Sequence, residues 1–104
     1  MQRGEVWWAN LPEPSGRRPV VVLSRDAAIH TRKNIIVAEV TTTIRQIPTE
    51  IPIHKSEGVP KDCVINLDVT NTVSKERLEK KITDLSSNKL QAMDKVLKYV
   101  LALS

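Results

Sequence analysis

Short hydrophobic runs, several of them alternating with polar positions, make up most of the chain before residue 86. In the segment 4–11, alternate residues such as Val6 and Trp8 share one face, which predicts a strand. The β-branched run Pro19–Ser24 has few polar breaks and predicts a strand that is buried on both faces. Further strands are expected at 34–41, 49–53, 62–68 (continuing over 69–73 after a bend) and 81–84. Pro52 cannot donate to a strand ladder, so its strand is expected at a sheet edge.

From Ser87 the period of the hydrophobic pattern changes. Apolar residues now recur at helical spacing, at Leu90, Met93, Leu97, Val100 and Leu101. Ser87 or Asn88 is expected to cap this helix. Short helical turns are expected at 26–28 and 75–78. The pattern therefore predicts a mainly β fold with α, in which a small, strongly bent sheet or barrel carries a C-terminal helix.

Length and composition agree with a single globular domain over residues 1–104. Hydrophobic residues make up 40% and charged residues 27%, which argues against a disordered chain. No apolar run approaches the length of a bilayer span, so no membrane partner is expected. The N-terminus has no signal-peptide pattern, and a cytoplasmic location is expected.

The charge balance points to one class of partner, and the residue types argue against several chemistries. Sixteen Lys and Arg against twelve Asp and Glu give +4, which permits a phosphate-bearing ligand. His30 and His54 lie far apart, with no other ligand at metal-binding spacing, so no metal and no cofactor are expected. Cys63 shares a strand face with Ile65 and Leu67, which favours a buried hydrophobe over a nucleophile.

Two polar groups remain as candidates. Arg17 and Arg18 close a loop where the stiff strand 19–24 begins, so that a guanidinium held there could form paired hydrogen bonds with a phosphate. Thr41–Thr43 ends the third strand with hydroxyl groups, and Arg45 follows. A solvated charge pair and plain β propensity are the alternative interpretations of these two patterns. Pattern alone therefore indicates a small basic β-rich domain with chemistry suited to nucleic acid.

Several blocks of the chain resemble the MazF/PemK/Kid family of toxin endoribonucleases. They occur in the family's order and cover nearly the whole chain. The blocks are Arg3–Trp8, Arg18–Ser24, Ile36–Thr41, Val59–Asp68, Ser74–Leu78 and Met93–Leu97. The resemblance implies an SH3-like β-barrel with a C-terminal helix that forms a homodimer. It also implies cleavage of single-stranded RNA without a metal, and a cognate antitoxin whose flexible tail covers the RNA groove.

The family's catalytic residues fall on Arg18 and Thr41 by this resemblance. In the family's reaction, a ribose 2′-hydroxyl attacks the adjacent phosphate and leaves a cyclic phosphate and a 5′-hydroxyl. Arg18 suits the role of an electrostatic clamp, because a guanidinium stays protonated and is a poor general base. It is also a candidate proton donor to the leaving oxygen. The group that removes the 2′-hydroxyl proton is not identified by the sequence.

The chain departs from the family in the loop Pro12–Arg17, which is shorter than in many relatives, and in one motif. Many relatives carry Glu-Gln-x-Arg-Thr where this chain has Asp68–Thr72, so that Asn71 replaces a second arginine and Val69 a glutamine. Asn71 can hydrogen-bond to RNA but brings no charge. The residues expected to contact RNA are Arg17, Arg25, Thr43, Arg45 and Asn71.

Three other functions stay open at this point. A related toxin family on the same fold inhibits DNA gyrase without catalysis. An RNA-binding module without cleavage and a purely structural interaction domain are the others. The presence of both Arg18 and Thr41 favours the nuclease, and the missing second arginine keeps binding without cleavage open.

Overall fold

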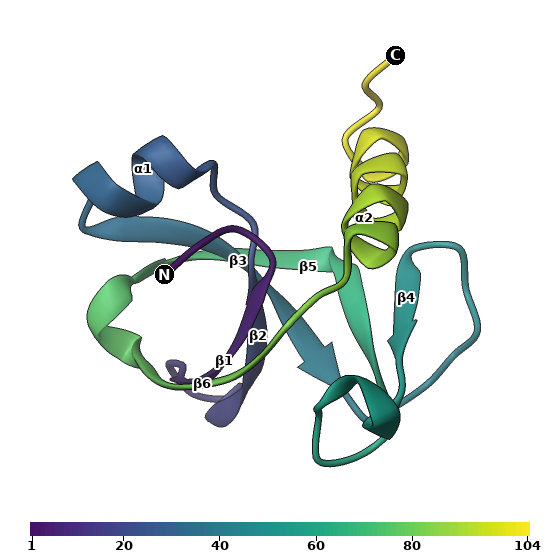
Figure 1. The fold of residues 1–104 in the computed structure, drawn as a ribbon, viewed down its shortest axis with the longest axis horizontal. Coiled ribbons are helices and arrows are strands. Elements are labelled where there is room, and N and C mark those ends of the chain that lie inside the picture. Colours follow the sequence, from purple (N-terminus) through teal and green to yellow (C-terminus); the bar gives the residue numbers. More distant parts are fainter.

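Six antiparallel strands form one curled sheet in the computed structural model, which describes all residues from Met1 to Ser104 (Figure 1). The spatial order is β4-β5-β3-β2-β1-β6, so β4 and β6 are the edges. The bounds are β1 Glu5–Asn10, β2 Arg17–Val22, β3 Asn34–Thr41, β4 Glu50–Ile53, β5 Cys63–Ser74 and β6 Leu78–Asp84. The prediction of a mainly β fold with a strongly bent sheet is confirmed, and Pro52 lies in an edge strand as expected.

Hydrophobic side chains cover both faces of the sheet. The sheet curls around one hydrophobic cluster, and the C-terminal helix packs against the cluster on the opposite face. Val21 of β2 belongs to a core that includes Met93 of the C-terminal helix. Its neighbour Val20 belongs to a second core with Val37 of β3. The prediction that the run 19–24 is buried on both faces is therefore confirmed.

Two α-helices flank the sheet: α1, Asp26–Thr31, and α2, Ser87–Val100. The α1 helix is longer than the single turn expected at 26–28. The cap of α2 is Ser86 rather than Ser87 or Asn88, because its hydroxyl accepts a hydrogen bond from the backbone N–H of Lys89 at 3.2 Å. Short 3-10 turns lie at Lys55–Glu57 (η1) and Lys75–Arg77 (η2). Neither α-helix has the length and apolar character that crossing a membrane requires.

A bulge in β5 bends the sheet beside the candidate site. Ala38 of β3 pairs with Thr70, but the next residue, Glu39, pairs with Asn66. The residues between, 67–69, are therefore extra on the β5 side, and the strand turns there (Figure 1). The bend predicted between 62–68 and 69–73 is confirmed within one continuous strand. The first half of β5 also pairs with β4, so that β5 lies between β3 and β4 in the sheet.

The arginine pair lies inside β2 rather than in the preceding loop. The strand begins at Arg17, not at Pro19, because Arg17 pairs with Asn10 and Arg18 pairs with Ala9 of β1. The last strand likewise begins at Leu78 rather than at Lys81. Strand pairing holds the backbone of both arginines, so their side chains emerge from fixed positions.

Candidate active site

The guanidinium of Arg18 forms an ion pair with a buried carboxylate. Its Nη1 donates to Oε1 of Glu39 at 3.0 Å, and its Nε donates to the carbonyl oxygen of Ser15 at 3.2 Å. Glu39 comes from β3, whose residues pair with those of β2. The Glu39 side chain is 11% exposed and that of Arg18 is 33% exposed. The pair therefore has a covered carboxylate and a guanidinium that reaches solvent.

Two further donors complete the surroundings of the carboxylate. The hydroxyl of Ser15, in the loop between β1 and β2, donates to Oε2 of Glu39 at 3.2 Å. The Nδ2 of Asn71, from β5, donates to the same oxygen at 2.9 Å. Three segments far apart in sequence thus meet at Glu39. The side-chain amide of Asn71, which the sequence predicts to contact RNA, therefore has one of its N–H donors bound to Glu39.

Arg18 keeps unused donors and lines a hollow that Thr41 also lines. Its Nη2 has no partner in the protein. Arg17, Arg18 and Thr41 line the same small surface hollow of about 170 Å³. Thr41 Oγ1 accepts a hydrogen bond from the backbone N–H of Thr43 at 3.1 Å, which orients the hydroxyl at the strand end. Charged N–H donors and a hydroxyl around a small opening are suited to binding a phosphate.

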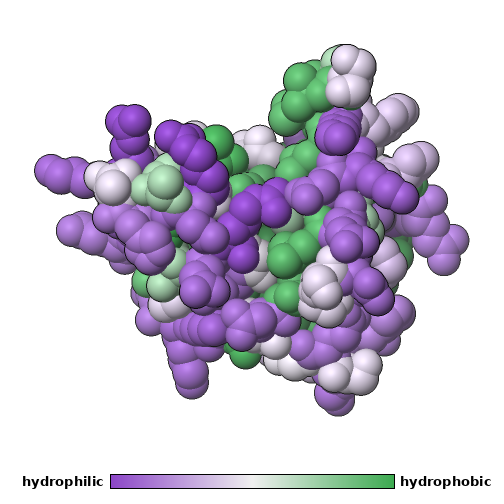
Figure 2. All heavy atoms as spheres, turned by 45° about the horizontal axis from the view of Figure 1, so that its top comes forward, coloured by the Kyte–Doolittle hydropathy of each residue, from purple (hydrophilic) through white to green (hydrophobic).

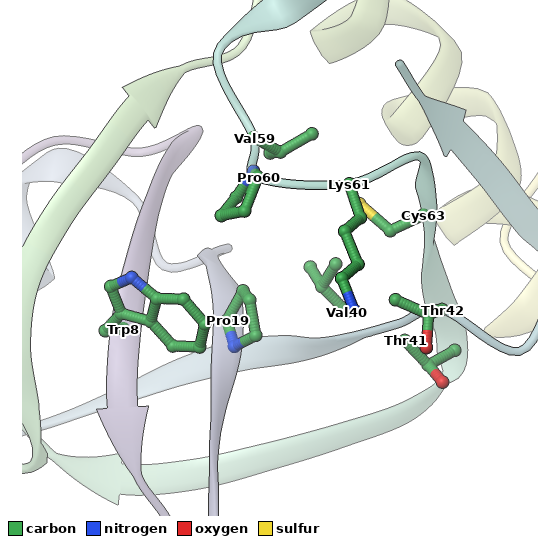
Figure 3. A pocket seen from close by; sticks show the side chains of 9 residues that line it. All are labelled: Trp8, Pro19, Val40, Thr41, Thr42, Val59, Pro60, Lys61 and Cys63. Atoms are coloured by element: carbon green, nitrogen blue, oxygen red, sulfur yellow. The ribbon is translucent and has the colours of Figure 1, made fainter. Parts of the chain in front are cut away.

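A second, more apolar hollow of about 210 Å³ adjoins the first and shares Pro19, Val40, Thr41 and Thr42 with it. Its other lining residues are Trp8 of β1, Cys63 of β5 and the loop residues Val59, Pro60 and Lys61. In Figure 3 the Lys61 side chain extends from this loop toward Val40, with Trp8 on one side and the two threonines on the other. The two hollows therefore place a mainly apolar space next to one lined by two arginines.

Arg17 contributes a second cation at the rim. Its guanidinium carbon lies 4.4 Å from the centroid of the Trp8 ring, a cation–π distance. Its Nε also donates to Oε1 of Glu79 at 3.2 Å, in an exposed ion pair. Such exposed pairs contribute little to stability. Arg17 is therefore free to exchange this partner for a ligand.

A buried carboxylate also organises the loop that follows Thr41. Oε1 of Glu50 accepts hydrogen bonds from the backbone N–H groups of Arg45 and Gln46 at 2.9 and 3.1 Å. Its Oε2 has no hydrogen-bond partner, and the Arg45 guanidinium lies 4.0 Å away. The Arg45 side chain is exposed. The loop thus presents Thr43 and Arg45 to solvent near the strand end that carries Thr41.

Arg25 lies away from this cluster. It precedes α1, next to Ser24, whose hydroxyl accepts from the backbone N–H of Ile36. Ile36 is five residues before Thr41, about 16 Å along the strand. The site therefore contains Arg17, Arg18 and Thr41, with Thr43 and Arg45 in the adjoining loop and Asn71 behind Glu39.

The cysteine and the histidines take no part in the cluster around Arg18. Burial raises the pKa of the Cys63 thiol, and the charges of Asp62 and Glu57 raise it further, which leaves little thiolate at neutral pH. The thiol lies 3.8 Å from the carbonyl oxygen of Ile53. No group of three or more His, Cys, Asp or Glu side chains is arranged to hold a metal ion.

Glu39 and Glu50 are the site residues that the sequence reasoning missed. Glu39 had a usable signal, because it shares a strand face with Ile35, Val37 and Thr41. A charged residue at an otherwise buried position needs partners, and it stands two residues before the candidate threonine. Glu50 had a weaker signal, because its strand has only four residues and no clear alternation.

The fold and the site together define a small curled-sheet domain that presents an arginine and a hydroxyl to a phosphate-sized opening. A family model described as "PemK-like, MazF-like toxin of type II toxin-antitoxin system" matches residues 2–101. The chain belongs to this family, and the resemblance read from its blocks is confirmed.

Two curated relatives come from Mycobacterium tuberculosis. The "Probable endoribonuclease MazF5" is 42% identical over 92 residues, which covers 88% of this chain and 84% of the relative. The "Probable endoribonuclease MazF2" is 37% identical over 91 residues, which covers 86% of this chain and 87% of the relative.

Solved structures share the fold across the whole domain. The "Mycobacterium tuberculosis toxin MazF-mt6" has a TM-score of 0.88 and 27% identity, and the match covers 96% of this chain and 98% of that one. A mycobacterial "Endoribonuclease in complex with its cognate antitoxin" also has a TM-score of 0.88, at 23% identity, with 100% and 97% covered. The expected SH3-like architecture with a C-terminal helix is confirmed by these neighbours.

Proposed function

We propose that this toxin is an endoribonuclease that cleaves single-stranded RNA through Arg18 and Thr41. The observation that carries the proposal is the arginine at the rim of the small hollow, held on one side and with unused N–H donors on the other. The curated relatives named as probable endoribonucleases support the same activity. Gyrase inhibition receives no support from those names.

The reaction we propose is an internal transfer of the phosphate. The ribose 2′-oxygen forms a bond to phosphorus, and the bond from phosphorus to the 5′-oxygen of the next nucleotide breaks. The 2′-hydroxyl loses its proton, and the departing 5′-oxygen gains one. The products are a 2′,3′-cyclic phosphate and a 5′-hydroxyl, so the sum is balanced without water or a cofactor.

Arg18 and Thr41 act on the charge that builds up in this step. The non-bridging oxygens become more negative as the 2′-oxygen attacks, and donors fixed beforehand stabilise that charge best. Arg18, whose Nη2 is free, and Thr41 line the same hollow. Arg18 can also donate a hydrogen bond to the departing 5′-oxygen as negative charge develops on that oxygen.

The adjoining apolar hollow is the proposed site for a base next to the cleaved bond. Its volume of about 210 Å³ and its walls, which include Trp8 and Pro60, suit the flat ring of a base. Lys61 adds a donor for the acceptor atoms on a base edge. Arg17 and Arg45, with Thr43, extend the binding surface to neighbouring phosphates.

The proposed assembly is a homodimer in the cytoplasm, inhibited by an antitoxin whose tail lies over the RNA-binding face. The support is membership of a type II toxin–antitoxin family and the solved endoribonuclease–antitoxin complex with the same fold. Exposed apolar residues at the C-terminal end, among them Tyr99, Leu101 and Leu103, offer surface for a partner. Figure 2 shows apolar surface both there and in the middle of the same face.

A cleavage assay on a long unstructured RNA in EDTA tests the function. We expect discrete cuts, and we expect each downstream fragment to carry a free 5′-hydroxyl that polynucleotide kinase can label. The matching upstream fragments should carry a cyclic phosphate. RNA that is bound with salt-dependent affinity but never cut would contradict the nuclease and support an RNA-binding module.

A further inference from the structure

We propose that Glu39 is a positioning residue that holds the Arg18 guanidinium in its working orientation, an inference that rests on the proposed function. Glu39 does not reach the reacting phosphate in this role. It acts through Arg18, to which its Oε1 is joined at 3.0 Å. Ser15 and Asn71 in turn fix the other carboxylate oxygen.

The hydrogen bonds determine the plane of the guanidinium. Nη1 is held by Glu39 and Nε by the carbonyl oxygen of Ser15, so the rigid group is anchored at both. The remaining nitrogen, Nη2, is thereby aimed rather than free to rotate. A free arginine side chain samples many rotamers, and ordering it at each binding event would cost free energy. Preorganisation removes that cost from the reaction step.

Packing alone does not explain a carboxylate at this position. Glu39 lies on the strand face of Ile35 and Val37, both of which are fully buried in an apolar core. A β-branched apolar residue would suit the same strand position. A buried ion pair is often no more stabilising than apolar residues of similar volume, because desolvation offsets the attraction. Control of Arg18 is the role that the geometry leaves for it.

The network also links Arg18 to the loop between β1 and β2. The Ser15 hydroxyl binds Glu39 while the Ser15 carbonyl binds Arg18, so the loop between β1 and β2 is attached to both partners. Asn71 reaches the same carboxylate from β5, close to the bulge at residues 67–69. The amide that stands where many relatives have a second arginine therefore supports the first arginine.

Glu39→Gln is the primary test, because it keeps the shape and removes the charge. We expect kcat for RNA cleavage to fall about 10- to 100-fold with KM nearly unchanged, since misplacing a reacting group acts mainly on the chemical step. The melting temperature should stay close to that of the unaltered protein. The matched control is Asp94→Asn. It removes the ion pair between Arg3 and Asp94 of α2 (2.7 Å) and should leave cleavage unchanged.

Chemical rescue separates positioning from a general structural role. Guanidinium chloride at millimolar concentration should restore part of the cleavage lost in Arg18→Ala. It should restore none in the Arg18→Ala/Glu39→Gln double variant, because the carboxylate that seats the ion is gone. Equal rescue in both would overturn the proposal. A rise in cleavage in Glu39→Gln would also overturn it, because Glu39 would then compete with the phosphate for Arg18.

A measurement without RNA keeps this inference apart from the proposed function. In ¹⁵N-labelled protein, the Nη1 protons of Arg18, which donate to Glu39, should exchange slowly with water, and in Glu39→Gln they should exchange fast. Absence of cleavage by the unaltered protein would refute the nuclease, and the Arg18 exchange rates would still decide the positioning. Unchanged exchange in Glu39→Gln would overturn the inference in either case.

Discussion

Arg17 and Arg18 are neighbours in β2, yet their side chains lie on opposite faces of the sheet. Arg17 stacks over the Trp8 ring at 4.4 Å, whereas Arg18 is held by Glu39 at 3.0 Å. Successive residues of a strand point to opposite sides, so a doublet of like residues is divided between two environments. Both arginines line the hollow beside Thr41, where Arg17 is exposed and exchangeable and Arg18 is fixed.

Arg17→Ala should weaken RNA binding without abolishing cleavage at saturating RNA. Arg17 is the exposed cation of the pair, and loss of one phosphate contact should reduce the slope of log affinity against log salt by about 0.7. Fluorescence anisotropy with a short single-stranded RNA over a salt series measures this slope. Lys98→Ala, which removes a charge from the exposed surface of α2, is the control and should leave the slope unchanged. An unaltered slope in Arg17→Ala would refute the contact.

Thr41→Val should lower kcat by about 10²-fold, the cost typical of removing one donor that stabilises transition-state charge. Valine keeps the shape and β propensity of threonine but lacks the hydroxyl. Single-turnover cleavage at saturating RNA measures the chemical step directly. Thr31→Val provides the control, because Thr31 only binds the carbonyl oxygen of Ala27 within α1. Equal rates for Thr41→Val and the unaltered protein would exclude the hydroxyl from the reaction.

Glu5 should make the fold more stable at neutral pH than in acid. Burial alone would raise the pKa of this carboxyl. A hydrogen bond from Trp7 Nε1 at 2.8 Å, a hydrogen bond with the backbone of Gln2 and the charge of Lys81 together lower the pKa below its ordinary value. A lowered folded-state pKa gives stability that is present above the unfolded value. That stability is lost as the pH falls through the folded-state pKa.

Urea unfolding followed by tryptophan fluorescence, from about pH 7 to about pH 3, checks this dependence. Glu5→Gln should be less stable than the unaltered protein by about 1–2 kcal/mol at neutral pH. The difference should shrink toward the acid end, where the unaltered carboxyl becomes protonated. Glu76→Gln, at an exposed glutamate without an ion pair, should show no such convergence. A difference that is constant over the whole pH range would contradict the account of Glu5.

Cys63 should react slowly with iodoacetamide at neutral pH. The pKa of its thiol is raised by burial and by the charges of Asp62 and Glu57, so that little thiolate is present. Mass spectrometry after timed alkylation gives the rate, with free cysteine as the reference. In urea the same residue should react as fast as the reference. Equally fast reaction in the folded protein would mean an exposed, activated thiol at the apolar hollow.

Alternation was sufficient to predict the strands, and residue pattern singled out the doublet Arg17–Arg18 and the run Thr41–Thr43. The choice of Arg18 and Thr41 within these groups came from the resemblance to the family. The β-branched run at 19–24 predicts a strand covered on both faces, and in the structure its valines are divided between the two hydrophobic cores. The partners of Arg18 could not be predicted in the same way. Contact between Glu39, Ser15 and Asn71 depends on the register of β5 and its bulge, which pairing across the sheet determines. The cap of α2 was missed because three candidate residues stand in succession, Ser86, Ser87 and Asn88.

The rate of RNA cleavage by Arg18→Ala, measured in EDTA beside the unaltered protein, decides whether Arg18 carries the reaction. We expect kcat to fall about 10²- to 10³-fold or more, because the main donor to the developing phosphate charge is lost. Because Arg18→Ala leaves the buried Glu39 carboxylate without its cation, the variant should melt at a lower temperature, and cleavage is compared well below that temperature. Cuts at the same positions and the same rate in Arg18→Ala would contradict the claim and would place the active centre elsewhere.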